Sequence, residues 1–310
     1  MSSLVASLLY SIASAFGRIP WSWLNRAADR IAGLWQRLDA RESRVTRRNL
    51  ELAFPQIAAS ERAQLQRAVL WTTAHQALET LRFWTRPRAE NLALIREQHG
   101  VELFEIAIAS GRGVIVAAPH HGNWELLNQW LASRTPLAIL YRPPESAIGE
   151  AFLQRVRADD AGRVTQVRAD GLAVRQLFKL LKDGGVVGIL PDQQPKAGDG
   201  EFAAFFGVPA LTMTLLPRLA ARTGAVVLFA WCERIGVDPA THAPLFALHL
   251  EPAPIELGAP DPVAGVRALN ATVERIARRN PDQYQWTYKR YTLRPPGSGE
   301  PNPYYDLERH

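Results

Sequence analysis

Residues 114–130, VIVAAPHHGNWELLNQW, join a short apolar run to a segment with helical periodicity. The run VIVAAP has the length of a buried strand, and the apolar spacing after Trp124 is typical of a helix. The same alternation continues along the chain. Further strands are expected at 137–141, 163–167, 186–190, 225–231 and 245–250, and helices at 101–110, 146–158, 170–183, 211–223 and 262–279. This order predicts an α/β fold with a mostly parallel mixed sheet flanked by helices.

The composition limits the kinds of partner and site. The 310 residues are 47% hydrophobic and carry a formal net charge of +6, with a pI near 9.8. A basic surface favours anionic partners such as acidic lipid, acidic protein or nucleic acid. Cys232 is the single cysteine, which excludes a disulfide within the chain and argues against a cysteine-based zinc site. Adjacent histidines without an H-E-x-x-H motif are a weak metal signal, so we expect no metal and no cofactor.

The first 17 residues, MSSLVASLLYSIASAFG, contain no charged side chain. They are short for a membrane span, which needs about 20 residues, so we expect an anchor or an interfacial helix. A signal peptide and a buried core helix are the alternatives, although a signal peptide normally has a basic start. Eight arginines and three acids follow between residues 18 and 48. If the first segment inserts, the positive-inside rule leaves the rest of the chain in the cytoplasm.

An apolar stripe at helical spacing over residues 24–38 extends this pattern, with Arg26, Arg30 and Arg37 on the opposite face. Such a stripe fits a helix at a membrane surface, and it also fits a helix packed on the rest of the protein. We therefore expect three parts. They are membrane-associated N-terminal helices at 1–40, one folded domain at 41–294 and a loose tail rich in Pro and Gly at 295–310.

Polar side chains follow three of the expected strands. VIVAAP leads to His120, LAILY to Arg142 and VVGIL to Asp192. Because ligands of open α/β sheets bind beyond the carboxyl ends of the strands, these residues are expected to converge on one active site. The alternative is that loops are polar in any soluble protein.

His120 and Glu125 form the most specific pair in the opening stretch. Glu125 is expected in the first turn of a helix, where the helix dipole favours an ionised carboxylate. Such a carboxylate can hold one imidazole nitrogen and leave the other to act as a general base. The backbone amides of Gly122 and Asn123 are candidates for stabilising an oxyanion. No G-x-S-x-G elbow, phosphate loop or dinucleotide fingerprint is present.

Together these motifs resemble the lipid A biosynthesis acyltransferases, within the glycerolipid acyltransferases that carry a His-x4-acid signature. The similarity rests on His120-x4-Glu125 and on segments in the expected order, namely RRNLELAFP at 47–55, HHGNWE, YRPPES, LPDQQP, GEFAAFFGVPALTMT and PDQYQWTYKRY at 281–291. An EGTR-type block, usual in phospholipid-making relatives, is missing.

The resemblance implies transfer of a fatty acyl chain from acyl carrier protein to a hydroxyl of a lipid A precursor, at the cytoplasmic face of the inner membrane. It implies His120 as general base with Glu125 as its partner, Arg142 and Asp192 as substrate-binding residues, and no nucleic-acid partner. Another membrane lipid, such as an ornithine lipid or a glycolipid, is the alternative acceptor. The phenylalanines at 152, 202, 205 and 206 line an acyl groove or belong to the core.

Two further interpretations compete with this one. HHGNWE also resembles the HHxxxD box of soluble condensation and alcohol acyltransferases, in which the second histidine, His121, is the base. Here the box ends in Glu-Leu rather than Asp-Gly. The other interpretation is a non-enzymatic membrane-binding protein that has kept the fold.

Overall fold

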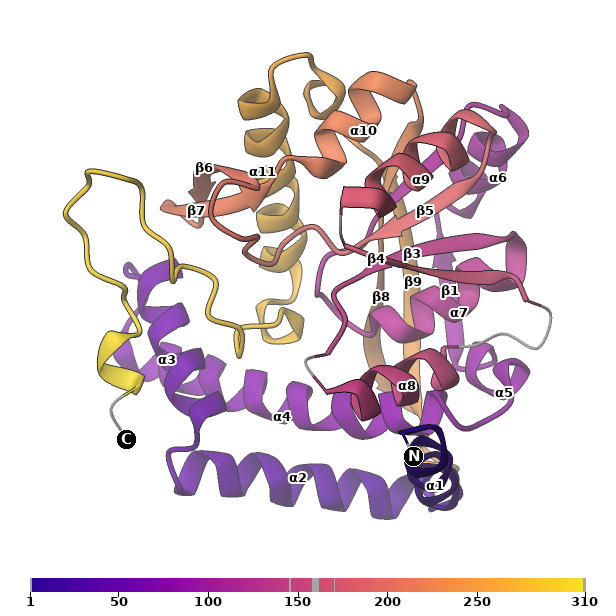
Figure 1. Cartoon of the computed structure of the whole chain (residues 1–310). Coiled ribbons are helices and arrows are strands. Elements are labelled where there is room, and N and C mark those ends of the chain that lie inside the picture. The colour runs from indigo at the N-terminus through magenta and orange to yellow at the C-terminus, as the bar shows by residue number, and fades with distance from the viewer. Residues whose placement is uncertain (1, 145, 158–161, 170, 309–310) are drawn as a thin grey trace.

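A seven-stranded mixed sheet lies at the centre of the folded domain (Figure 1). The computed structural model describes residues 2–144, 146–157, 162–169 and 171–308, so the outermost residues of some expected segments, 1, 158, 170, 309 and 310, lie outside it. The strand order is β1-β9-β8-β2-β5-β3-β4. Their bounds are β1 Ile95–His99, β2 Val114–Ala117, β3 Leu137–Tyr141, β4 Val164–Arg168, β5 Val186–Ile189, β8 Val226–Val237 and β9 Pro244–Pro252.

Five neighbouring strands run parallel, from β8 through β2, β5 and β3 to β4. β9 is antiparallel to β8, and β1 is parallel to β9. The prediction of an α/β fold with a mostly parallel mixed sheet is confirmed. Every residue of β2 is buried, because successive side chains enter two different cores: Ile115 and Ala117 face one, and Val114 and Val116 face the other.

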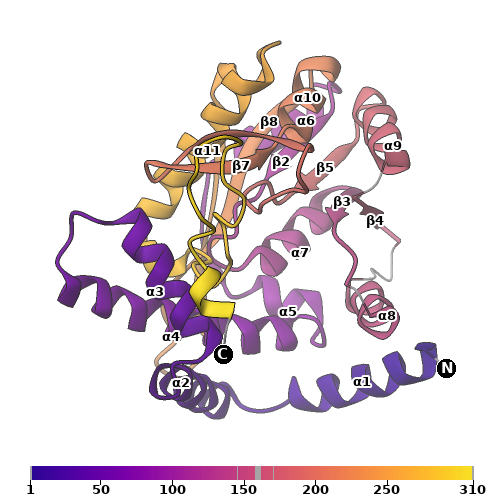
Figure 2. The same cartoon turned by 60° about the vertical axis from the view of Figure 1, so that its left-hand side comes forward.

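Helices cover both faces of the sheet (Figures 1 and 2). α6 (Val101–Ala109) and α7 (Trp124–Arg134) pack on one face, and α9 (Gly171–Lys182), α10 (Leu215–Thr223) and α11 (Pro262–Arg279) pack on the other. α7 begins at Trp124 because the Asn123 side chain accepts a hydrogen bond from the backbone N–H of Leu126. Shorter elements complete the chain, namely α5 Arg88–Leu92, α8 Ala147–Val156 and the 3-10 helices η1 Ile255–Gly258, η2 Pro281–Gln283 and η3 Tyr305–Glu308.

Three strands differ from the sequence-based expectation. In β1, four of five residues are exposed, so this edge strand has no apolar run to mark it. β6 (Gly200–Phe205) and β7 (Val208–Met213) form a separate hairpin around Phe206 and Gly207, which both have positive φ angles. The expected helix at 211–223 consequently begins only at Leu215. Phe205 and Phe206 belong to the core around Trp286.

The N-terminal part consists of α1 (Ser2–Phe16), α2 (Trp21–Arg37), α3 (Arg41–Ala53) and α4 (Ala59–Phe83). In Figure 1, α2 and α4 lie side by side below the sheet, and α1 packs along α8. Among the residues that the structure describes, no helix is both long and apolar enough to cross a membrane.

The apolar stripe of α2 is divided between two environments. Its centre, Ala28 and Ala32, packs against α4 in a small apolar cluster. Leu34 and Leu38 of the stripe are 53% and 68% exposed, and the neighbouring Trp23 is 65% exposed. Packing on the protein is therefore confirmed for the centre of the stripe, and contact of its exposed residues with a membrane stays a prediction.

The C-terminal segment expected to be a loose tail is anchored at Tyr304. This side chain is fully buried in the main core, and its hydroxyl donates a hydrogen bond to Oδ1 of Asn49 in α3. Nearby, Arg48 and Asp306 form an ion pair with an Nη2–Oδ2 distance of 2.8 Å. The segment up to residue 308 is thus fastened to α3, and the division of the chain at residues 40 and 294 stays a prediction.

Replacing Tyr304 tests this anchor. Tyr304→Ala should lower the free energy of unfolding by about 3–5 kcal/mol, because it empties a buried aromatic site. The adjacent Tyr305, which is 57% exposed, provides the matched control, and Tyr305→Ala should change stability by less than about 0.5 kcal/mol. Equal effects of the two substitutions in urea unfolding would show that the segment is not anchored there.

Candidate active site

His120 and Asp192 meet beyond the ends of two adjacent strands. His120 follows β2 and Asp192 follows β5, and the imidazole Nδ1 lies 2.7 Å from Oδ1 of Asp192. The backbone N–H of His120 also donates to Oδ2 of Asp192 at 2.9 Å. Both side chains are more than nine-tenths buried. The expected convergence of these two strand-end residues is therefore present in the structure.

The carboxylate of Asp192 fixes the tautomer of His120. Burial alone would raise the pKa of Asp192, but the charge and hydrogen bonds of His120 outweigh burial and hold that pKa below its ordinary value. An ionised carboxylate only accepts hydrogen bonds, so the neutral imidazole carries its proton on Nδ1. The unprotonated Nε2 is then available as an acceptor of protons.

Glu125 does not contact His120. Its carboxylate accepts hydrogen bonds from Trp84 Nε1 at 3.1 Å and from Arg157 Nε at 3.1 Å, and a second guanidinium nitrogen of Arg157 completes a bidentate pair. Glu125 lies in the first turn of α7, from which its side chain points to the ends of α4 and α8. The expected His120–Glu125 hydrogen bond is thus replaced by the one with Asp192.

Glu125 and Arg157 line a cavity of about 730 Å³. Apolar side chains of Phe83, Trp84 and Ile139 form part of its wall. Among the described residues, the lining contains five arginines and one acid, Glu125. The cavity therefore combines apolar surface with positive charge. No sequence motif marked Arg157, because its place here depends on where α8 packs.

The amides proposed for an oxyanion site are already engaged. The backbone N–H of Gly122 donates to the Gln283 carbonyl at 3.0 Å, and that of Asn123 donates to the Cys232 carbonyl at 2.7 Å. Gly122 has a φ of +61°, and an added Cβ would lie 2.1 Å from the Cys232 carbonyl oxygen. These bonds fix the loop between β2 and α7, so the expectation that the two amides face a substrate is wrong.

The segment 281–291 packs against the residues that follow β2 and β5. The Gln285 N–H donates to the His120 carbonyl at 3.0 Å, and the Tyr288 hydroxyl accepts from the Gln194 N–H at 3.1 Å. Burial, and then the charge of Asp192, raise the pKa of Tyr284 well above its ordinary value. Arg142 lies exposed just beyond β3, and its charge acts on Tyr288. The segment 281–291 thus contributes directly to the site.

His121 points away from His120 and its partner. It is fully buried, and its Nε2 lies 4.0 Å from Oε1 of Glu233. Glu233 also pairs with Nε2 of His249 at 3.2 Å. Burial alone would raise the pKa of Glu233, but its contacts with His121, His249 and Asn280 hold that pKa far below its ordinary value. His121 is therefore placed in a buried polar cluster on β8 and β9.

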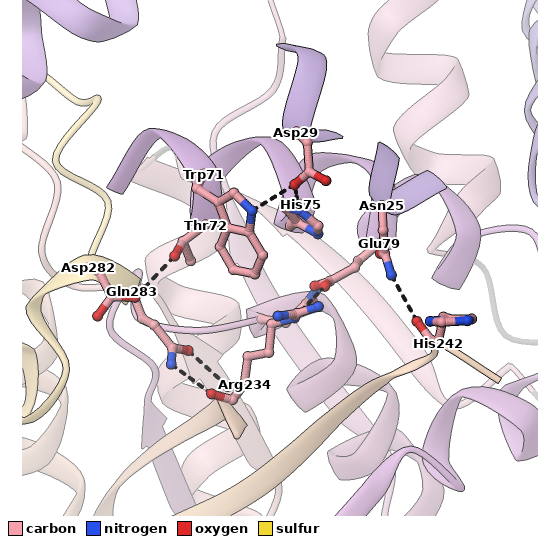
Figure 3. Close-up of polar contacts among 11 residues, drawn as sticks. Asn25, Asp29, Trp71, Thr72, His75, Glu79, Arg234, His242, Asp282 and Gln283 are labelled. Atoms are coloured by element: carbon pink, nitrogen blue, oxygen red, sulfur yellow. Dashed lines mark hydrogen bonds and ion pairs between the residues drawn. The ribbon is translucent and has the colours of Figure 1, made fainter. Parts of the chain in front are cut away.

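A second polar network lies between α4, α2 and β8, where Glu79 meets Arg234 and Asp29 meets Trp71 and His75 (Figure 3). Glu79 of α4 is buried, accepts from Arg234 Nε at 3.0 Å and accepts a longer bond of 3.4 Å from the Asn123 side chain. Burial raises the pKa of Glu79, and Arg234 and Asn123 offset this only in part. Along the same face of α4, Trp71 and His75 both bind Asp29 of α2. α2 and α4 are thereby linked to the loop between β2 and α7.

Replacing Glu79 should destabilise the fold through its partner. Glu79→Ala leaves Arg234 buried without its counter-charge, and we expect the free energy of unfolding to fall by about 3 kcal/mol. Glu97, an exposed acid on β1, is the control, because Glu97→Ala should cost less than about 0.5 kcal/mol. A stability of Glu79→Ala within 0.5 kcal/mol of the parent protein, measured in urea, would contradict this structural role of Glu79.

The lowered pKa of Asp192 predicts a defined pH dependence of stability. Its contribution is present above the unfolded-state pKa, about 3.9, and is lost as the pH falls through the lower folded-state value. Asp192→Asn should therefore be less stable than the parent by about 2 kcal/mol at pH 7, and the difference should shrink below about pH 4. Urea unfolding at pH 7 and pH 3 measures it, and a constant difference would disagree with the prediction.

Comparison with known proteins identifies the family of this chain. Residues 2–292 match the family described as bacterial lipid A biosynthesis acyltransferase. Among curated relatives, the palmitoleoyltransferase of lipid A biosynthesis from Escherichia coli K12 is 26% identical over 284 residues, 90% of this chain and 88% of the relative. The lauroyltransferase from the same organism is 25% identical over 285 residues, covering 90% and 89%. The myristoyltransferase is 26% identical over 262 residues, covering 84% and 78%. The chain belongs to the bacterial lipid A biosynthesis acyltransferase family and is an acyltransferase.

Proposed function

We propose that this enzyme transfers a fatty acyl chain from the thioester of acyl carrier protein to a hydroxyl of a lipid A precursor, with His120 as general base. The observation that carries the proposal is the 2.7 Å contact between His120 Nδ1 and Asp192, in a chain of the lipid A acyltransferase family. Asp192, expected as a substrate-binding residue, takes the orienting role that was expected of Glu125.

The proposed reaction needs no nucleophile from the protein. Nε2 of His120 removes the proton of the acceptor hydroxyl while that oxygen attacks the thioester carbonyl. The carbon–sulfur bond then breaks, and His120 returns the proton to the thiolate that leaves. Asp192 stabilises the imidazolium that forms between these two proton transfers. The products are an ester on the lipid and the free thiol of the carrier protein.

The cavity next to Glu125 is proposed to bind the acyl donor. Its apolar side chains suit a hydrocarbon chain, and its arginines suit phosphate, such as that of the carrier's pantetheine arm. In this role Glu125 acts by holding the guanidinium of Arg157 in place. Arg142, exposed at the end of β3, is proposed to bind phosphate of the donor or of the lipid.

The N-terminal helices are proposed to place the enzyme on the cytoplasmic face of the inner membrane. Leu8 and Ile12 of α1 are 61% and 59% exposed, and Trp23 of α2 and Leu38, the residue after α2, are more than 60% exposed. Exposed arginines accompany them, at positions 18, 26, 30 and 37. Apolar side chains beside basic ones fit the interface of an anionic bilayer.

Replacing His120 tests its proposed role as the general base. His120→Ala should reduce kcat/KM by about 10²–10⁴-fold, because the general base is lost. The exposed His99 is the control, and His99→Ala should retain activity. Purified variants are assayed with acyl carrier protein thioesters and a lipid A precursor, and the products are identified by mass spectrometry. Near-normal transfer by His120→Ala would end the proposal.

The same assay separates the alternatives. A folded His121→Ala variant that loses more activity than His120→Ala would favour the condensation-type mechanism. Lipids from a strain without this protein identify the acceptor, because the missing acyl group is found on a lipid A precursor or on another membrane lipid. Liposome binding without turnover of any acyl donor would indicate a non-enzymatic protein.

A further inference from the structure

Gln193 covers the reactive nitrogen of His120. Its side-chain Nε2 lies 3.2 Å from Nε2 of the imidazole and donates a second hydrogen bond, also 3.2 Å long, to Oε1 of Gln285. A carboxamide nitrogen has two N–H groups and no acceptor, so both of its donors are assigned. Because Asp192 holds the proton on Nδ1, the contact at Nε2 is one in which Gln193 donates to the lone pair of a neutral base.

Gln285 holds the carboxamide of Gln193 in this position. Gln285 accepts from it, and the backbone of Gln285 is tied in turn to the His120 carbonyl at 3.0 Å. The next residue, Gln194, is fixed separately, since its Oε1 accepts from the Leu293 N–H at 2.8 Å and its own N–H donates to Tyr288. The adjacent Gln193 and Gln194 therefore have different partners, and of the two only Gln193 contacts Nε2 of His120.

The lipid hydroxyl must come within hydrogen-bond distance of His120 Nε2, about 2.6–3.2 Å, before the imidazole can remove its proton. The Gln193 nitrogen already occupies that distance. The hydroxyl and the carboxamide therefore compete for one lone pair. Once His120 has taken the proton, an amide N–H facing Nε2 is unfavourable, and a rotated carboxamide would present its oxygen instead.

We infer that Gln193 is a positioning residue for His120, which covers the base until the lipid hydroxyl displaces it and which favours the neutral form of the imidazole. The inference rests on the proposed function, because it requires His120 to be the base. It adds a specific competitor at the reacting nitrogen, drawn from the LPDQQP segment at 190–195.

Other charged groups around His120 set the background of a pH measurement. Asp192 faces Nδ1 and is ionised at neutral pH, while burial keeps Tyr284 and Tyr288 neutral there by raising the pKa of each. The other elements packed around the loop also carry charged or titratable groups. Arg290 and Arg142 lie near the segment 281–291. Glu79 lies on α4, Glu125 on α7, and His121 and Glu233 toward β8. None of these groups changes when Gln193 is replaced.

The test is the pH dependence of kcat/KM with acyl carrier protein thioester and lipid A precursor. Gln193→Glu places a carboxylate against the imidazolium, so the acid limb of the profile should move up by about one pH unit or more. Gln193→Ala removes the donor to the neutral ring and the competitor for the hydroxyl. Its acid limb should rise by a smaller amount, and KM for the lipid should fall, by up to about fivefold if one ordinary hydrogen bond is removed.

Gln194→Glu is the matched control, because it introduces the same charge one residue along without touching His120. Its acid limb should move by less than about 0.3 pH unit, as expected for a charge without direct contact. Circular dichroism confirms that each variant is folded. An acid limb of folded Gln193→Glu that moves no further than that of Gln194→Glu would overturn the inference.

His120→Ala separates the two proposals. If it retains activity, the proposed function fails, whatever the Gln193 variants do. If it is inactive and Gln193→Glu leaves the profile unchanged, the general base stands and only the inferred role of Gln193 is lost.

Discussion

The hydrogen bond between Asp192 and His120 depends on the register of two parallel strands. β2 pairs with β5 so that Ala117 lies opposite Ile189. His120 and Asp192 each follow these partners by three residues, and the two loops therefore bring them to the same height above the sheet. A shift of register by one residue would move every side chain of β2 to the other face and separate the pair. The site is thus a direct consequence of sheet pairing.

This dependence explains which parts of the site could be predicted from the sequence. Strand-end positions are readable from apolar runs, so His120 and Asp192 could be assigned to one edge of the sheet in advance. The partner of His120 could not, because the sequence does not reveal that β5, and not β3, is the neighbour of β2. Glu125 is close to His120 along the chain, but the helix that carries it turns its side chain toward Arg157.

The features that the sequence did not reveal share a physical origin. Backbone amides have no sequence signature, and the directions of the Gly122 and Asn123 amides are set by carbonyls of residues 283 and 232. β1 is an exposed edge strand whose charged residues carry no strand pattern, and Arg157 gains its importance only from the packing of α8. In each case the partner is distant in the sequence, whereas periodicity reports only local order.

The adjacent histidines show how this architecture separates neighbouring residues. His120 is held by Asp192 and the LPDQQP segment, while His121 pairs through the backbone with Tyr284 and turns its ring toward Glu233. The backbone bends at His120, where the His121 N–H donates to the Pro119 carbonyl at 2.7 Å, and the two side chains leave this bend in different directions. One position of a pair that looks equivalent in sequence therefore faces the strand-end site, and the other is buried against β8. The proposed role of His120 as a base therefore rests on this geometry more than on the spacing to Glu125.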